Sequence, residues 1–121
     1  HQADRGEGWR TIEAPLDLVS VIQGEINPGE SVLIDCLTLW LSNLFHHNRD
    51  IEQETMALCN ALQSSQVQIA LVSNEIGLGL VPETSLGRAF RDAQGRLNQN
   101  VAAVCDQVDF VAAGLPLRLK G

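Results

Sequence analysis

The chain has 121 residues, of which 45% are hydrophobic and 19% are charged, as in ordinary globular proteins. These proportions exclude a disordered, collagen-like or low-complexity chain, and the length suits one domain over residues 1–121. Lys and Arg number 8 against 15 Asp and Glu, a formal net charge of −7, which argues against a nucleic-acid or anionic-membrane binder.

Elements at the beginning of the chain are a loop, a short strand and a helix. Residues 1–14 have mixed charges and no clear period, with a strand predicted over 9–13. Pro15 suits the first turn of a helix, and the apolar spacing extends that helix to about residue 25. Residues 27–30, Asn-Pro-Gly-Glu, have the composition of a turn.

A buried strand and two helices are predicted next. Residues 31–36 are an apolar run that ends in an acid, which is typical of a buried parallel strand. Thr38 is expected to cap the helix that follows, and the pair His46-His47 interrupts it. Adjacent histidines point to different faces, so we interpret them as helix C-terminal interactions rather than as metal ligands. A second helix is predicted over residues 51–65.

The rest of the chain alternates strand, helix and strand. Residues 67–73 predict a strand, 74–82 a glycine-bearing loop, and 83 to about 106 a long helix with one apolar stripe. A strand over 107–113, a turn at 114–116 and an edge strand over 117–120 complete the chain. This order predicts an α/β fold with a parallel sheet and crossover helices, in which ligands bind beyond the carboxyl ends of the strands.

Asp35 is the first candidate for chemistry. An acid that closes a buried strand is typical of a Walker B element, in which the carboxylate holds Mg²⁺ beside nucleotide phosphates. Many such strands also end in Asp as a cap or turn former, so the pattern leaves both roles open. The phosphate loop GxxxxGK[ST] is absent from the 121 residues, and Gly77-Leu78-Gly79 lacks the Lys and Ser/Thr needed to replace it.

Other candidates carry weaker signals. Asn74-Glu75 ends the second strand, where it contacts a substrate or forms a turn. His1 has an imidazole that can attack phosphorus, with arginines nearby, although a histidine at a chain end is more often solvated. On the long helix, Arg88 and Asp92 have the spacing of an ion pair, and Arg91 is the residue that would face a substrate or partner.

The three cysteines, Cys36, Cys59 and Cys105, are an odd number in apolar surroundings, which predicts reduced, buried thiols in a cytoplasmic protein. No apolar run approaches the roughly 20 residues of a membrane helix, and no secretory signal opens the chain. The chain opens with His1 in the middle of a polar stretch, and we expect a preceding segment in the complete protein.

Five motifs together resemble one known family. They are WRTIEAP (9–15), VLIDCLTLWLSNL (32–44), LVSNEIGLGLVPE (71–83), FRDAQGRLNQ (90–99) and AGLPLRLK (113–120). In this order they are similar to the adenosylcobinamide kinase/adenosylcobinamide-phosphate guanylyltransferase family. The resemblance covers the whole chain and implies a P-loop, RecA-like α/β fold and a homo-oligomer, often a trimer.

The resemblance also implies a function in cobalamin biosynthesis. Members of the family phosphorylate adenosylcobinamide with a nucleoside triphosphate, ATP or GTP. They then transfer GMP from GTP to that phosphate, which gives adenosylcobinamide-GDP and pyrophosphate. The implied partners are therefore a corrinoid and nucleotides, with Mg²⁺ as the cofactor, and neither nucleic acid nor a membrane.

Site residues follow from the matched motifs. The family's GMP-carrying histidine, eight residues before the Trp of W-R-T-x-E, corresponds to His1. The next four positions, which contact GTP, are Gln2, Ala3, Asp4 and Arg5. Glu13 corresponds to the acid of W-R-T-x-E, which contacts the guanine nucleotide, and Asp35 to the Walker B acid that holds the metal.

One departure from the family is large. The first strand, the phosphate loop and the helix after it are missing from the 121 residues, so we expect an N-terminally truncated form that is inactive and aggregation-prone alone. Two alternatives stay open: another P-loop small-molecule kinase, and a non-catalytic nucleotide-binding or assembly module of the same fold.

Overall fold

The computed structural model describes residues 8–121, and the predicted site residues His1, Gln2, Ala3, Asp4 and Arg5 lie outside this range. The elements in chain order are α2 (Leu18–Gly24), β1 (Val32–Asp35), α3 (Leu37–His46), α4 (Ile51–Ser64), β2 (Ile69–Val72), α5 (Ser85–Val104), β3 (Val108–Ala112) and β4 (Leu115–Lys120). None of the helices within residues 8–121 is long and apolar enough to cross a membrane.

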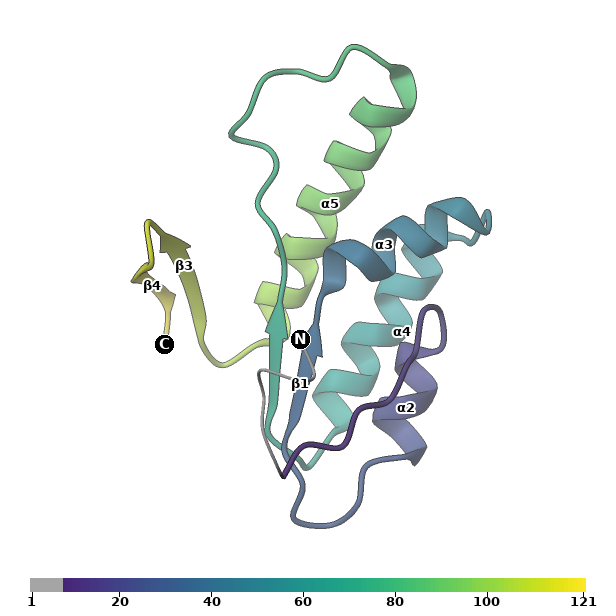
Figure 1. Cartoon of the computed structure of the whole chain (residues 1–121), viewed down its shortest axis with the longest axis vertical. Coiled ribbons are helices and arrows are strands. Elements are labelled where there is room, and N and C mark those ends of the chain that lie inside the picture. The colour runs from purple at the N-terminus through teal and green to yellow at the C-terminus, as the bar shows by residue number, and fades with distance from the viewer. Residues whose placement is uncertain (1–7) are drawn as a thin grey trace.

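Strands β1 and β2 form a two-stranded parallel sheet and point the same way in Figure 1. Helices α3 and α4 make the crossover between them, as parallel pairing requires. Asp35 pairs with Val72, so the carboxyl ends of the two strands are level. The predicted parallel sheet with crossover helices is confirmed for these two strands.

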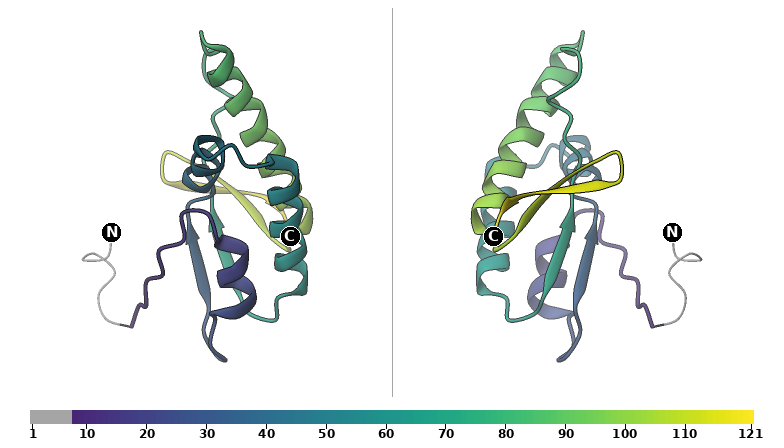
Figure 2. Two further views of the ribbon diagram at one scale, coloured as in Figure 1. Left: turned by 90° about the vertical axis from the view of Figure 1, so that its right-hand side faces the viewer. Right: turned by 90° about the vertical axis from the view of Figure 1, so that its left-hand side faces the viewer.

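The hydrophobic core lies on one face of this sheet, between the strands and the four helices. Its buried members come from β1 and from α2 to α5: Leu18, Ile22, Ile34, Leu37, Trp40, Leu41, Leu44, Leu58, Ala61, Ala93, Leu97 and Val101. The predicted full burial of β1 is wrong, because Ile34 is buried while Leu33 and Asp35 are exposed on the other face. Figure 2 shows α2 and α4 on the opposite side of β1 from the segment that enters α2.

Two predicted helix starts differ from the structure. Helix α2 begins at Leu18 rather than near Pro15, and the carbonyl oxygens of Pro15 and Leu16 accept hydrogen bonds from side chains of α3. Thr38 does not cap α3, whose N-cap residue is Cys36. Helices α4 and α5 are confirmed within one to two residues at each end.

The strand predicted over residues 9–13 is absent from the structure. A strand needs a partner ladder, and within residues 8–121 β1 is hydrogen-bonded only to β2. Arg10 instead reaches the turn before β1, where it contacts Glu30 and the carbonyl oxygen of Glu25. This segment is therefore held by side chains rather than by backbone pairing.

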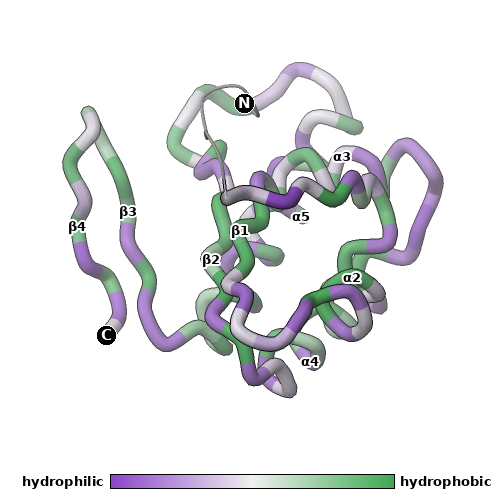
Figure 3. Tube along the Cα trace, turned by 60° about the horizontal axis from the view of Figure 1, so that its bottom comes forward, coloured by the Kyte–Doolittle hydropathy of each residue, from purple (hydrophilic) through white to green (hydrophobic). Residues whose placement is uncertain are grey.

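The last two strands form an antiparallel hairpin that stands apart from the parallel sheet in Figure 3. Both predicted strands are confirmed, but within residues 8–121 β3 pairs only with β4 and does not extend the parallel sheet. The turn also comes earlier than predicted, at Ala113 and Gly114, which both have positive φ, 54° and 74°. Lys120 Nζ connects the hairpin to the end of α5 by hydrogen bonds to the carbonyl oxygens of Ala102 and Ala103.

Cysteine burial is less than predicted. Cys36, Cys59 and Cys105 are free thiols as expected, but each is only partly buried. Desolvation raises the pKa of the Cys59 and Cys105 thiols, so both stay protonated near neutral pH.

Candidate functional site

A groove of about 850 Å³ lies between residues 8–15 and the sheet, and it contains both predicted site residues of the described chain. Glu13 lines it from the entering segment, and Asp35 lines it from the end of β1. The side chains of Trp9, Leu39 and Trp40 add apolar surface to the walls. The structure therefore brings together two acids that are 22 positions apart in the sequence.

Asp35 occupies the position at which α/β sheets bind ligands, the carboxyl end of a parallel strand. Its side chain is exposed and makes no hydrogen bond or ion pair with another residue of the described chain. Residues 8–121 contain no group of three or more His, Cys, Asp or Glu side chains that could hold a metal together. One free carboxylate is the kind of ligand that Mg²⁺ uses when nucleotide phosphates and water complete its coordination.

Arg10 fixes the wall of the groove. Its Nη2 lies 2.6 Å from Oε1 of Glu30 and 2.9 Å from the carbonyl oxygen of Glu25, and Asn27 N donates to the same Glu30 oxygen at 2.7 Å. The hydrogen bond from Arg10 lowers the pKa of Glu30, and the same bond raises the pKa of Arg10. The guanidinium of Arg10 is therefore engaged with Glu30.

At the end of β2, a set of polar side chains holds Asn74. Thr38 Oγ1 accepts from the backbone N–H of Asn74 at 2.9 Å, and Asn98 Nδ2 donates to the backbone oxygen of Asn74 at 3.1 Å. Gln94 Nε2 donates to Asn98 Oδ1 at 2.9 Å and to Ser73 Oγ at 3.0 Å. Sequence reasoning singled out Asn74 but missed the residues that hold it.

A signal for two of these residues is present in the sequence. Gln94 and Asn98 are four positions apart on α5, and both fall beside the buried residues Ala93 and Leu97. A polar pair at helical spacing within an apolar stripe predicts a buried hydrogen-bonded network. Thr38 and Ser73 carry no such signal, because their partners are distant in the sequence.

The loop after Asn74 is shaped by its own side chains and by two arginines of α5. Glu75 Oε1 accepts from the backbone N–H of Gly77 at 2.6 Å, and a Cβ on Gly77 would meet that oxygen at 2.8 Å. Arg91 donates to the carbonyl oxygen of Gly77, and Arg88 donates to those of Pro82 and Glu83. The predicted Arg88–Asp92 ion pair is therefore wrong.

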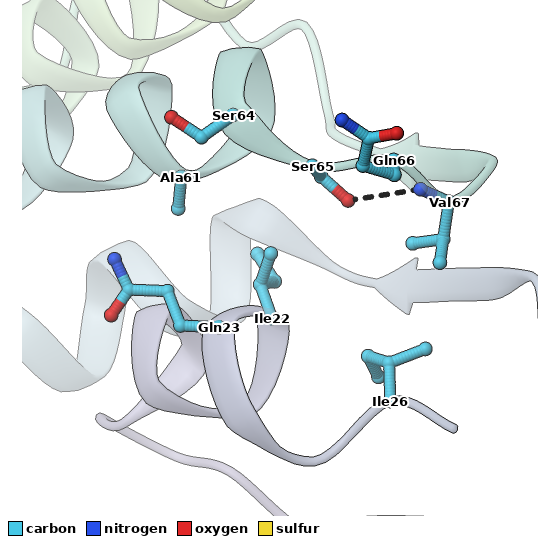
Figure 4. A pocket seen from close by; sticks show the side chains of 8 residues that line it. All are labelled: Ile22, Gln23, Ile26, Ala61, Ser64, Ser65, Gln66 and Val67. Carbon is cyan, nitrogen blue, oxygen red and sulfur yellow. Dashed lines mark hydrogen bonds between the residues drawn. The ribbon is translucent and has the colours of Figure 1, made fainter. Parts of the chain in front are cut away.

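A smaller hollow of about 270 Å³ lies at the opposite end of the sheet (Figure 4). Helix α2, the end of α4 and the approach to β2 line it with Ile22, Gln23, Ile26, Ala61, Ser64, Ser65, Gln66 and Val67. These residues include the approach to the amino end of β2, whereas ligands of α/β sheets bind at the carboxyl ends. The candidate site is therefore the groove at Asp35.

Comparison with known proteins identifies the same family that the five motifs resemble. A family model described as cobinamide kinase / cobinamide phosphate guanyltransferase matches residues 1–119. The bifunctional adenosylcobalamin biosynthesis protein CobP of Pseudomonas aeruginosa is 44% identical over 123 residues, which cover 100% of this chain and 71% of that protein.

Two enterobacterial proteins are similar over nearly the same range. The bifunctional adenosylcobalamin biosynthesis proteins CobU of Escherichia coli and Salmonella typhimurium are 37% and 33% identical over 135 residues. In each case the match covers 99% of this chain and 75% of the relative. The chain therefore belongs to the cobinamide kinase / cobinamide phosphate guanyltransferase family.

Proposed function

We propose that this protein is a bifunctional transferase of cobalamin biosynthesis, which phosphorylates adenosylcobinamide and then transfers GMP from GTP to adenosylcobinamide phosphate. The family match over residues 1–119 carries the proposal, since it includes four of the five motifs in full and all but the last residue of the fifth. It favours this function over an unrelated P-loop kinase or a non-catalytic module. The groove that contains Glu13 and Asp35 supports it as a place for a nucleotide.

For the kinase step, we propose a P-loop, RecA-like nucleotide site built around the carboxyl ends of β1 and β2. Asp35 would hold Mg²⁺, which neutralises charge on the phosphate oxygens of ATP or GTP. The acceptor hydroxyl forms a bond to the γ-phosphorus as the bond to the bridging oxygen breaks. The nucleoside diphosphate leaves with that electron pair, and the hydroxyl proton passes to solvent.

For the guanylyl step, the nucleophile we propose is His1. A neutral ring nitrogen of His1 attacks the α-phosphorus of GTP, and pyrophosphate leaves. A phosphate oxygen of adenosylcobinamide phosphate then attacks the same phosphorus and releases the histidine. Gln2, Ala3, Asp4, Arg5 and Glu13 are the residues proposed to contact the guanine nucleotide, of which Glu13 lines the groove.

Labelling with GTP tests this assignment. Incubation of the intact protein with α-labelled GTP should leave acid-labile label on the protein, and His1→Asn should abolish that label while some kinase activity remains. His46→Asn is the matched control, because His46 is an exposed histidine at the end of α3 and does not line the groove. Normal labelling of the His1→Asn protein would show that another residue carries GMP.

The guanylyl step should also depend on pH. A protonated imidazole has no lone pair for attack, so the labelling rate should fall as the pH drops below the ordinary histidine pKa of about 6.5. Stopped-flow or quench-flow rates between pH 5 and 8, with pre-equilibrated buffers, measure this directly. A rate that rises as the pH falls would contradict a neutral His1 nucleophile.

Oligomeric state and location complete the proposal. We propose a homo-oligomer, a trimer by analogy with the family, in the cytoplasm, where the three free thiols would stay reduced. Light scattering after gel filtration of the intact protein measures the oligomeric state. A monomeric mass at micromolar concentration would contradict it.

A further inference from the structure

The backbone of Asn74 is held from two helices at once. Its N–H donates to Thr38 Oγ1 in the first turn of α3, and its carbonyl oxygen accepts from Asn98 Nδ2 of α5. The Asn74 side chain is exposed and makes no hydrogen bond with another residue between 8 and 121. The structure therefore fixes the backbone of this residue and leaves its carboxamide available to a ligand.

Behind Asn98, a buried amide sets its orientation. Gln94 is 1% exposed, and its Nε2 donates to both Asn98 Oδ1 and Ser73 Oγ. Ser73 Oγ in turn donates to Asn98 Oδ1 at 2.6 Å, so that oxygen accepts two bonds and the Asn98 amide nitrogen faces Asn74. A buried amide costs stability unless its groups are bonded, and Gln94 Oε1 has no donor within residues 8–121. An apolar residue would fill this position of α5 without that cost.

This network and Asp35 lie at the same end of the β1–β2 sheet, although Asn74 itself does not line the groove. Asn74 is two residues beyond Val72, the register partner of Asp35, and Thr38 is three residues after Asp35. Paired strands lie about 4.8 Å apart and rise about 3.3 Å per residue, so the backbones of Asn74 and Asp35 share one small area of the sheet edge. A phosphate held at Asp35 through a metal would be within reach of a side chain from that area.

We propose that Asn74 is a substrate-contacting residue whose carboxamide N–H donates to a phosphate oxygen of the bound nucleoside triphosphate. Thr38, Gln94 and Asn98 are then positioning residues that act through Asn74. A fixed donor aimed at developing charge stabilises the transition state without reorganisation. This inference rests on the proposed kinase function and adds to it a residue that the Walker B pattern does not contain.

Kinetics of single variants provide the first test. In the intact protein, Asn74→Ala should lower kcat of the kinase step by about 10²-fold, with a smaller change in KM for the nucleotide. Thr38→Val keeps the side-chain shape but removes the oxygen acceptor, so kcat should fall by about tenfold, whereas Thr38→Ser should restore it. Asn100→Ala, an exposed asparagine of the same helix, is the control and should change neither constant.

A double variant shows whether Thr38 acts by positioning Asn74 or only by supporting the fold. If Thr38 acts through Asn74, then Thr38→Val combined with Asn74→Ala should be no slower than Asn74→Ala alone. Multiplicative losses in the double variant would overturn the positioning role. Thermal unfolding of each variant shows whether it is folded, and Asn74→Ala compared with Asn100→Ala carries the test where Thr38→Val does not fold.

A binding measurement distinguishes this inference from the proposed function. The Asn74 side-chain NH₂ resonance, assigned by its loss in Asn74→Asp, should shift when Mg²⁺ and a non-hydrolysable GTP analogue are added. A shift in a protein that catalyses neither step would support the contact and overturn the proposed function. An active protein with no shift and a normal Asn74→Ala kcat would overturn this inference alone.

Discussion

Single side chains attach the entering segment to the body of the protein. Trp40 Nε1 donates to the carbonyl oxygen of Leu16 at 3.1 Å, and Asn43 Nδ2 donates to that of Pro15 at 3.1 Å. Arg10 adds its contacts with Glu30 at the turn before β1. These bonds satisfy backbone oxygens that a helix or strand would otherwise use, and they hold Glu13 at the wall of the groove.

The Arg10–Glu30 pair should make stability depend on pH. The folded-state pKa of Glu30 is lowered, so its stabilisation is fully present above the unfolded pKa and is lost as the pH falls through the folded pKa. Glu30→Gln should therefore lower the unfolding free energy slightly at neutral pH, and the difference from the unmodified protein should vanish in acid. Urea unfolding at several pH values measures this.

Glu83→Gln is the control for that experiment, because the exposed Glu83 side chain makes no hydrogen bond or ion pair with another residue of 8–121. The effect of Glu30→Gln should stay small, since both side chains of the pair are partly open to water and screened by salt. A difference that grew toward acid pH would contradict the lowered pKa.

Helices α4 and α5 begin at residues whose side chains accept a backbone hydrogen bond from the first turn. Asp50 Oδ1 accepts from Gln53 N at 3.1 Å at the start of α4, and Thr84 Oγ1 accepts from Gly87 N at 3.0 Å at the start of α5. The first turn of α4 also carries Glu52 and Glu54, which suit the positive end of the helix dipole. Both starts agree with the predicted boundaries because a cap is a local interaction.

Removal of the α4 cap should cost stability without changing the site. Asp50→Ala should lower the unfolding free energy by about 1 kcal/mol, because the backbone N–H of Gln53 loses its acceptor. Asp50→Asn retains a side-chain oxygen and should lose much less. Chemical denaturation of the three proteins side by side decides this, and equal losses for both variants would assign the effect to charge rather than to the cap.

The whole molecule has one core on one face of a small sheet. Leu58 of α4 is 0% exposed within that core, whereas Met56, two residues earlier on the opposite face of the same helix, is 65% exposed. The opposite face carries the exposed Leu33 and Asp35, next to the groove. Leu33 and Asp35 of β1 therefore line the candidate groove with exposed side chains, whereas the buried Ile34 between them belongs to the core.

Substitutions in the core and at the surface of α4 should differ in how much they lower the free energy of unfolding. Leu58→Ala should lower the unfolding free energy by about 2–5 kcal/mol, because it removes buried apolar contacts and leaves a cavity. Met56→Ala, a similar truncation at the surface, should change it by less than about 0.5 kcal/mol. Thermal unfolding followed by circular dichroism measures both, and equal losses would contradict the single core on this side of the sheet.

Local patterns by themselves determined most element positions. The apolar runs of β1 and β2, the 3.6-residue periodicity of α4 and α5, and the turn before β1 all follow from residues close in sequence. The placement of Asp35 and Asn74 at strand ends also follows from these patterns, because side-chain period and strand length are local properties. The five motifs identified the family from sequence alone.

Only the tertiary structure decided which groups that are distant in the sequence form hydrogen bonds with each other. Thr38 has the composition of a cap, but its hydroxyl accepts from Asn74, 36 residues later. The sequence predicts a strand over residues 9–13, but within the described chain this segment does not pair with β1. Side-chain contacts such as that of Arg10 with the carbonyl oxygen of Glu25 hold it instead. A hydrogen bond needs a partner at the right distance and angle, and for distant residues only the folded chain supplies that geometry.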